Sequence, residues 1–487
     1  MIPPSDVKAM SKGGGFNMKN DKERDLFANK PIWFAILSLA VPSVLGQLIL
    51  VLYNLADTFF VGLANNNAML TAVTVVMPAY MFLSAIANLF GVGAASLISR
   101  SIGAGIPEKA KHAFAFSIYG SLVVGAVYCL LCLFFADGFI DLLGGTDPEV
   151  HANAVKYLYI CIVFCGVPTI LNNTLAHLLR AHGMSFHASL GVVLGGILNV
   201  AFDPLFMFVI LGKENVVLGA GLATGLSNVI ALLYYVVLLI IKRKKILFTL
   251  VPSKAMFQRH IPVDIILVGL PACLMTLCEN ISYAILDKMM SSFGLSAQTG
   301  IGAAKKVNMV AHSVVRGMAQ GVLPLIGYNA TSGDHHRMKK AVYLSTGVSA
   351  TIAIVCFLIN FIFPTALLRI FLNDPTNPAL PYGTKFLRIL SVGAPFSAVA
   401  YSIISFFQAV GKGGRSLLLA LLRKGILDIP VMFVLFFCGL PSEISMFGIV
   451  GATPIADFVC FLIALILFFS FLKQHAAMFD DKTLEDN

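Results

Sequence analysis

Four oxygen-bearing side chains stand out because they lie inside long apolar runs of the 487-residue chain: Asp57, Asn199, Asp203 and Thr224. A carboxylate in the apolar part of a membrane costs roughly 2.5 to 3.5 kcal/mol, so such a residue normally has a partner or a function. Asn199 and Asp203 are four residues apart and therefore share one face of a helix. Together the four residues offer hard oxygen ligands suited to Na⁺, and two neighbouring carboxylates can instead hold a proton.

The depths of these residues along their helices favour one common site. Asp57 lies about 24 residues into the first apolar run and Asp203 about 14 into the fifth, both past the membrane midplane. Thr224 lies one to two turns into the sixth run, which enters from the opposite side. We therefore predict a cation-coupling site for Na⁺ or H⁺. Asp57 could instead be a polar helix end, and Asp203 could serve the backbone ahead of Pro204, whose ring removes a helix hydrogen bond.

The second half of the chain holds further candidates for coupling or substrate binding: Glu279, Asn280, Lys306 and Asp428. Glu279 lies about 17 residues into its apolar run, past the midplane. It could also form a purely structural ion pair with Lys306, because pairing is the usual way to bury a charge in a membrane. Asp428 lies near mid-depth, with Arg423 and Lys424 one turn earlier as candidate structural partners.

The elements that must position these residues are apolar helices. Hydrophobic residues make up 58% of the chain and charged residues only 12%, about half the charged share of a soluble protein, so a soluble globular protein is excluded. Twelve apolar runs are separated by Gly, Pro or charged breaks: residues 33–61, 70–98, 113–135, 155–176, 190–211, 218–241, 263–290, 299–328, 341–363, 386–409, 417–440 and 447–472. We predict an all-α integral membrane protein with twelve transmembrane helices.

Basic residues predict the orientation. With the N-terminus in the cytoplasm, the inside segments hold 23 Lys and Arg residues, Arg180 among them, whereas the outside segments hold only Lys213, Arg369 and Lys385. We therefore expect a multi-pass protein of the plasma membrane with both termini in the cytoplasm. This asymmetry also explains the net charge of +10 without a nucleic-acid partner.

The chain contains an internal duplication. Shifting the sequence by 228 or 229 positions aligns features of the same kind, such as Gly105 with Gly333 and Gly183 with Gly411. Each unit has an even number of helices, so the copies are parallel repeats, and such repeats commonly enclose a substrate cavity at their interface. The predicted layout is a cytoplasmic tail, a first lobe, a cytoplasmic linker, a second lobe and a second cytoplasmic tail: residues 1–30, 31–241, 242–260, 261–472 and 473–487.

The sequence lacks several common catalytic motifs. It contains no phosphate-binding GxxxxGK[ST] loop, no HExxH zinc helix and no GxSxG nucleophile motif. The nine cysteines lie in apolar runs and are expected to be small core residues. We expect a monomer that is not an enzyme, holds no cofactor and has small molecules and membrane lipids as its partners.

Several segments together resemble the MATE family of multidrug and toxic compound extrusion transporters, over residues 31 to 472. They are Pro42 and Gln47, the run from Asp57 to Gly62, the run from Gly93 to Arg100 with Gly103 to Gly105, the run from Asn199 to Pro204, and the run from Gly321 to Asn329. The resemblance implies twelve helices in two lobes arranged as a V, with a cavity between them. It also implies export of organic, often cationic, compounds driven by inward flow of Na⁺ or H⁺.

The resemblance also assigns residues. It implies that the four oxygen-bearing residues of the first lobe form the cation site and that Glu279 is the family's seventh-helix glutamate. The acid that some bacterial members carry in the tenth helix has no counterpart near Ser397 and Ala398. We expect a cavity of negative potential with adaptable Met and Phe side chains in its wall, which would favour lipophilic cations.

A flippase for lipid-linked precursors of related architecture is the alternative. It would need a cationic cavity that holds a diphosphate. Four basic residues lie inside apolar runs and keep this alternative open: Lys306, Arg316, Arg388 and Arg423. Whether they face the cavity separates the two functions.

Overall fold

The structure is a computed structural model that describes residues 22–63, 66–243, 245–258, 260–372, 374, 376–439 and 441–475. Most of the predicted N-terminal tail and of the C-terminal tail, and two positions of the predicted linker, lie outside the described residues.

The first half of the described chain is helical throughout, with short turns between the helices. Its elements are α2 (Lys22–Ala28), α3 (Ile32–Gly62), α4 (Asn67–Gly103), α5 (Pro107–Phe134), α6 (Ala136–Leu142), α7 (Pro148–Leu158), π-helical η1 (Tyr159–Phe164), α8 (Gly166–Ala181), α9 (Ser185–Pro204), π-helical η2 (Leu205–Ile210), the short η3 (Lys213–Asn215) and α10 (Val216–Ile241).

The second half repeats this plan. Its elements are the short η4 (Lys254–Phe257), α11 (Ile261–Ser291), α12 (Leu295–Ser332), α13 (His335–Ile362), α14 (Pro364–Leu368), α15 (Ala379–Val392), α16 (Ala394–Ala409), α17 (Gly413–Leu421), π-helical η5 (Leu422–Asp428), α18 (Ile429–Phe437) and α19 (Ser442–Gln474).

Length and hydropathy identify the membrane spans. Within the described part, nine helices are long and apolar enough to cross a membrane. Two further spans are bent pairs, α7–η1 with α8 at 50° and α15 with α16 at 41°. The remaining predicted run, residues 417–440, is the continuous helix α17–η5–α18, which carries three buried charges, Arg423, Lys424 and Asp428. The predicted all-α membrane fold is confirmed, and each of the twelve apolar runs corresponds to one of these helical segments.

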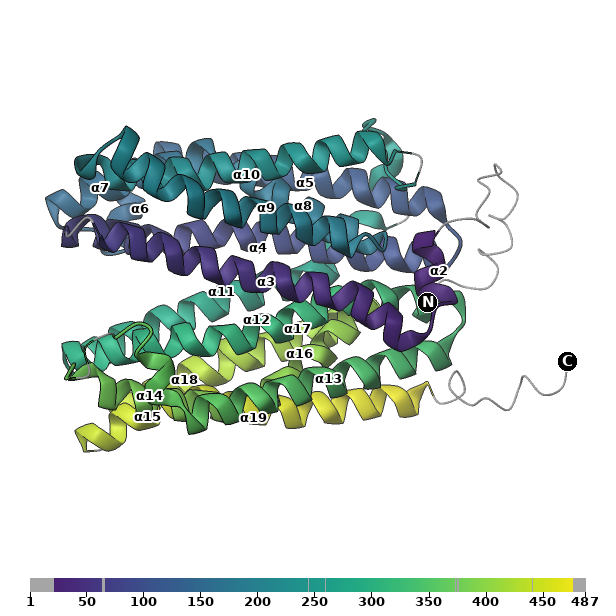
Figure 1. The fold of residues 1–487 in the computed structure, drawn as a ribbon. Helices are drawn as coiled ribbons and strands as arrows, with labels where there is room; N and C mark the ends of the chain where they lie inside the picture. The colour runs from purple at the N-terminus through teal and green to yellow at the C-terminus, as the bar shows by residue number, and fades with distance from the viewer. Residues whose placement is uncertain are drawn as a thin grey trace, which may run out of the picture.

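The helices form two bundles, α3 to α10 and α11 to α19, which lie side by side (Figure 1). Equivalent elements keep the spacing found in the sequence: α4 and α12 begin 228 residues apart, at Asn67 and Leu295, and so do α5 and α13, at Pro107 and His335. The two bends, at Cys165 and Gly393, are also 228 residues apart. The duplication therefore extends to the irregular features of the helices.

Glycines allow the two bundles to touch closely along α4–α11 and α3–α12. The four glycines in these contacts are Gly93, Gly269, Gly317 and Gly321. A side chain at Gly269 would overlap the backbone carbonyl of Leu89, and one at Gly93 would overlap that of Ile265. Small residues at such positions let helix backbones pack directly against one another in a membrane.

Hydrogen bonds join the bundles at the end of the molecule where α2 lies (Figure 1). The Ser96 hydroxyl donates to the Gln408 carbonyl at 2.5 Å, and the Thr331 hydroxyl donates to the Arg100 carbonyl at 2.7 Å. Arg337 donates to the Phe27 carbonyl of α2 at 2.7 Å. Two of the segments that carry the family resemblance, around Gly93 and Gly321, thus belong to the packed end of the lobe interface.

Candidate functional site

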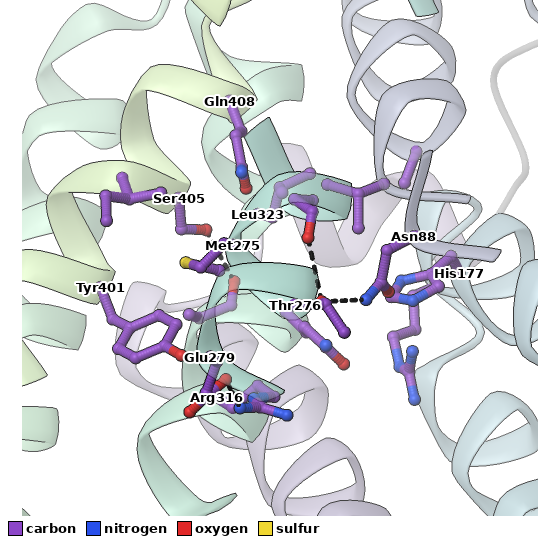
Figure 2. Close-up of a pocket in the computed structure, with 17 residues that line it drawn as sticks. Asn88, His177, Met275, Thr276, Glu279, Arg316, Leu323, Tyr401, Ser405 and Gln408 are labelled. Carbon is purple, nitrogen blue, oxygen red and sulfur yellow. Dashed lines mark hydrogen bonds and ion pairs between the residues drawn. The ribbon is translucent and has the colours of Figure 1, made fainter. Parts of the chain in front are cut away.

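A cavity lies between the two lobes. The empty space among its lining residues, open solvent included, is about 1460 Å³. Its wall comes from α3, α4, α8, α9 and α10 of the first lobe and α11 and α12 of the second. A second cavity of about 650 Å³ adjoins it (Figure 2). The two share seven lining residues: Asn88, His177, Arg180, Thr276, Glu279, Arg316 and Gln320.

Two hydrogen bonds cross between the lobes at the cavity wall. The Asn88 amide of α4 donates to the Thr276 hydroxyl of α11 at 2.9 Å (Figure 2). The Gln47 amide of α3 donates to the carbonyl oxygen of the Gln320 side chain of α12 at 3.2 Å. Both bonds must break if the lobes separate here, and uncharged polar groups can exchange them for water or for a bound molecule.

The four predicted cation-site residues surround one region of the first lobe beside the cavity. The Asn199 amide donates to the Thr224 hydroxyl at 3.1 Å, and both residues line the cavity. Asp57 and Asp203 are buried, and the two carboxylates lie within electrostatic range of each other. Tyr53, which lines the cavity, lies within electrostatic range of both.

Four buried oxygens of this group accept no hydrogen bond from any residue that the structure describes. They are one carboxylate oxygen of Asp57, both of Asp203 and the amide oxygen of Asn199. Buried polar groups are normally hydrogen-bonded, so a set of unpartnered acceptors in one place is unusual and suits a bound cation or proton. Asp57 is buried rather than a solvated helix end. No described residue donates a hydrogen bond to Asp203, so none of them gives it a purely structural role.

Glycines bring the helices of this group together. In α9, a side chain at Gly196 would collide with Ile49 of α3, and Gly195 packs on α10. In α10, Gly219 and Gly225 lie on either side of Thr224 and press against η2 and Cys165. Asp203 itself precedes Pro204, where α9 gives way to the wider π-helical turn η2, a geometry that is often found at functional sites.

Glu279 in the second lobe is paired with Arg316, at 2.6 Å, so the alternative pairing with Lys306 is wrong (Figure 2). The reason is depth along two antiparallel helices. Glu279 lies roughly 27 Å from the N-terminal end of α11, and Arg316 lies roughly 24 Å from the C-terminal end of α12, whereas Lys306 is roughly 39 Å from that end. Asn280 lines the cavity beside Glu279.

The other two second-lobe candidates do not belong to the described cavity wall. Lys306 is half-buried, with its ammonium 5.9 Å from the centre of the Phe371 ring. Asp428 is fully buried within its lobe, where Lys424 lies at 2.8 Å and two hydroxyls, of Ser282 and Thr453, donate to it. Asp428 is therefore satisfied by structural partners.

Asp457 is a buried acid that the sequence analysis missed. Its carboxylate pairs with Arg423 at 2.7 Å, and both side chains are almost completely inaccessible. Of the two candidate partners named for Asp428, Lys424 forms the pair, whereas Arg423 pairs with Asp457 instead. The available signal was an acid inside the last apolar run, with an arginine inside the run before it.

Arg180 was counted as a basic residue of an inner loop, yet it lies in the last turn of α8, is 3% exposed and lines both cavities. The cavity wall thus holds two arginines and one glutamate among the described residues, not the expected excess of negative charge. Of the four basic residues named for the flippase alternative, only Arg316 lines the cavity, and Glu279 neutralises it.

The MatE family model matches residues 42–205 and 271–434, two segments of equal length that begin 229 residues apart. The chain belongs to the MatE family. The two matched MatE segments coincide with the repeats of the fold, so the resemblance noted in the sequence is confirmed.

Named relatives of this MatE chain span nearly its whole length. It is 28% identical to the multidrug export protein MepA of Staphylococcus saprophyticus over 448 residues, which cover 92% of this chain and 96% of the relative. It is also 28% identical to MepA of Staphylococcus aureus strain MRSA252 over 455 residues, with the same coverage.

Solved structures share the MatE fold. A crystal structure of MATE in complex with MaL6 matches with a TM-score of 0.84 and 26% identity, over 93% of this chain and 100% of the other. A MOP superfamily transporter from Pyrococcus furiosus, described as having a binding pocket of reverse polarity, matches with a TM-score of 0.83 and 26% identity, over 93% and 99%.

Proposed function

We propose that this MatE protein exports organic small molecules across the plasma membrane in exchange for Na⁺ or H⁺ that flows inward. The observation that carries the proposal is the set of unpartnered buried oxygens beside a cavity that both lobes line. The similarity to multidrug export proteins along most of the chain supports the same function. In this proposal the protein is a monomer in contact with membrane lipids. Both of its termini lie in the cytoplasm, an orientation that the excess of basic residues in the predicted inner segments favours.

In this proposal the coupling ion binds at Asp57 and Asp203. Na⁺ would balance the negative charge of these carboxylates, whereas H⁺ would protonate one of them. Both oxygens of Asp203 and one of Asp57 accept no hydrogen bond from the described protein. Asn199 and Thr224 belong both to this group and to the cavity wall. If the Asn199 amide oxygen turns toward the ion, the surface that a substrate contacts changes. Binding of the ion would therefore weaken binding of the substrate, and the reverse.

The second lobe contributes the opposite wall. Glu279 and Asn280 line the cavity, and we assign them contact with substrate. Lobe rocking about the glycine contacts of α4–α11 and α3–α12 would then expose the cavity to each side in turn, as in other transporters built from two repeats.

Dye export from an efflux-deficient bacterial host tests the role of the acids. We expect Asp203→Asn to lower export at least about tenfold, because the amide cannot supply the charge that holds a cation. Glu108→Gln is the matched control, since Glu108 is an exposed acid paired with Lys111. Export at the wild-type rate by Asp203→Asn would exclude the proposed coupling role.

Membrane vesicles identify the coupling ion. Vesicles that hold either an imposed Na⁺ gradient or an imposed pH gradient are given a transported dye, and the decay of each gradient is followed. Exchange predicts that the dye accelerates the decay of one gradient in wild-type vesicles and of neither in Asp203→Asn vesicles. A dye flux that leaves both gradients unchanged would contradict exchange.

The flippase alternative is less well supported. It requires several cationic groups around a diphosphate, whereas Lys306, Arg388 and Arg423 are absent from the described cavity wall and Arg316 is paired with Glu279. Arg180 is the remaining cation of the wall, and a single guanidinium suits one anionic group better than a diphosphate.

A further inference from the structure

Arg180 is a buried charge for which the proposed exchange has no use. It lies one residue before the end of α8, is 3% exposed and lines both cavities between the lobes. Its position in the last turn is favourable for a cation, because the carbonyl groups at a helix C-terminus carry partial negative charge. That interaction alone does not require the guanidinium to face a cavity.

No described residue pairs with Arg180. Its side chain forms neither an ion pair nor a hydrogen bond with a described residue, and its Nε is buried without a partner. Glu279, the carboxylate in the cavity wall, is already held by Arg316 at 2.6 Å. Tyr235 lies within electrostatic range, but its hydroxyl donates to the Ala188 carbonyl. A buried arginine is normally paired, so this one has capacity for a ligand.

The surroundings of Arg180 fit an anionic group. A guanidinium presents planar pairs of N–H donors that match the two oxygens of a carboxylate. His177, one turn earlier on α8, lies within electrostatic range and lines the same cavity, as does the Asn88 amide of α4 (Figure 2). The adjoining wall holds apolar groups of Val92, Met275 and Leu323, which suit a ring system rather than a small inorganic ion.

We propose that Arg180 binds the carboxylate of the transported molecule, so that the substrates of this protein include aromatic compounds that carry a carboxylate, whether anionic or zwitterionic. That the bound molecule is transported rests on the proposed export function, whereas the binding site rests on the geometry of Arg180 alone. It differs from the expectation of simple lipophilic cations, which an unpaired arginine in the wall would repel.

A matched pair of dyes tests this proposal. Rhodamine B carries a free carboxylate beside its cationic ring system, and its ethyl ester is the same cation without the carboxylate. Binding of each to the purified full-length protein in detergent is followed by fluorescence anisotropy. We expect the wild type to bind the acid at least about tenfold more tightly than the ester, as one charge-assisted pair of hydrogen bonds allows.

Three variants separate recognition from structure. Arg180→Gln should lose the preference for the acid while ester binding stays the same or improves, and Arg180→Lys should retain part of it. Arg388→Gln is the matched control, because it removes an exposed arginine of α15 outside the described cavity wall. An unchanged preference in Arg180→Gln, or equal binding of both dyes by the wild type, would overturn the proposal.

A competition experiment on the wild type tests the proposal even if the Arg180→Gln variant does not fold. Benzoate, but not benzyl alcohol, should displace rhodamine B from the wild type, and failure of benzoate to do so would also overturn the proposal. These measurements need no ion gradient, so they remain interpretable if the exchange reaction itself fails. The gradient assay with the ester tests exchange without involving Arg180.

Discussion

Charged side chains inside the membrane fall into two groups according to whether they are paired. Arg423 with Asp457, and Lys424 with Asp428, form ion pairs inside the second lobe, although both terminal nitrogens of Arg423 and one oxygen of Asp457 have no hydrogen-bond partner among the described residues. Asp203 in the first lobe and Arg180 at the cavity have unpartnered buried atoms within the described structure. Paired charges stabilise a lobe, whereas unpaired ones are where an ion or a substrate group can bind.

The Arg423–Asp457 pair gives a stability prediction. Asp457→Ala would leave a fully buried guanidinium without its counter-charge, so we expect a loss of about 3 to 5 kcal/mol in the free energy of unfolding. The double variant Arg423→Met with Asp457→Leu should regain most of this loss. Thermal unfolding of the purified proteins in detergent measures both. The exposed pair Lys111–Glu108 is the control, where Glu108→Ala should cost below about 1 kcal/mol.

The Thr224 hydroxyl gives a prediction for ion affinity. Thr224→Val keeps the shape of the side chain but removes the oxygen that accepts from the Asn199 amide at 3.1 Å. We expect the concentration of coupling ion needed for half-maximal export to rise about tenfold, consistent with the loss of one ligand or hydrogen bond to a charged site. Thr224→Ser should stay close to the wild type. An unchanged ion dependence in Thr224→Val would remove Thr224 from the site.

At the scale of helices, glycine positions decide which elements can touch. Gly195 and Gly196 of α9 pack on α10 and α3, and this contact brings Asn199 to Thr224. Gly93 and Gly269 likewise allow the backbones of α4 and α11 to touch at the interface of the lobes. The close approach in both contacts depends on the absence of a side chain rather than on a specific polar group.

Gly269→Ala should weaken the packed end of the lobe interface, because the new Cβ would overlap the Leu89 carbonyl and the backbone of α4 must move. We expect a lower temperature of unfolding in detergent and greater access of water-soluble reagents to the cavity from the cytoplasmic side. Gly302→Ala in α12 is the control: no atom lies within 4 Å of its added Cβ, so helix propensity should make it neutral or slightly stabilising. Equal stability of the two variants would refute the packing argument.

At the scale of the whole molecule, the duplication gives two lobes with the same arrangement of helices. Their buried acidic residues differ in whether they are paired. The fourth and tenth spans are bent at equivalent positions, Cys165 and Gly393. The first lobe nevertheless carries unpartnered acids and the second carries paired ones. We infer that the first lobe binds the coupling ion and that the second provides the opposing wall of the cavity.

Orientation in the membrane can be tested with single cysteines. Lys213 and Lys412 are exposed residues at opposite ends of helical spans. With the predicted topology, Lys213→Cys reacts with a membrane-impermeant maleimide in intact cells, whereas Lys412→Cys reacts only after permeabilisation. Cys438 is exposed and should first be replaced by serine, which removes a native label at the outer end of α18. The reverse labelling pattern would invert the topology.

The sequence by itself determined the helical spans, the duplication and the acids of the first lobe, because apolar length, punctuation and spacing are properties of the local chain. It also identified the partner of Asp428 as Lys424 or Arg423, since residues four or five positions apart lie close on one helix. Only the tertiary structure decided the pairing of Glu279 with Arg316.

The same limit explains Asp457 and Arg180. Whether Arg423 meets Asp457, and whether Arg180 faces lipid, an inner loop or the cavity, depends on which helix lies opposite, at what depth and with what rotation about its axis. Those three quantities arise from packing between segments far apart in the chain. Spacing along one segment does not contain them, so the position of Arg180 in the cavity wall appeared only when the two lobes were seen together.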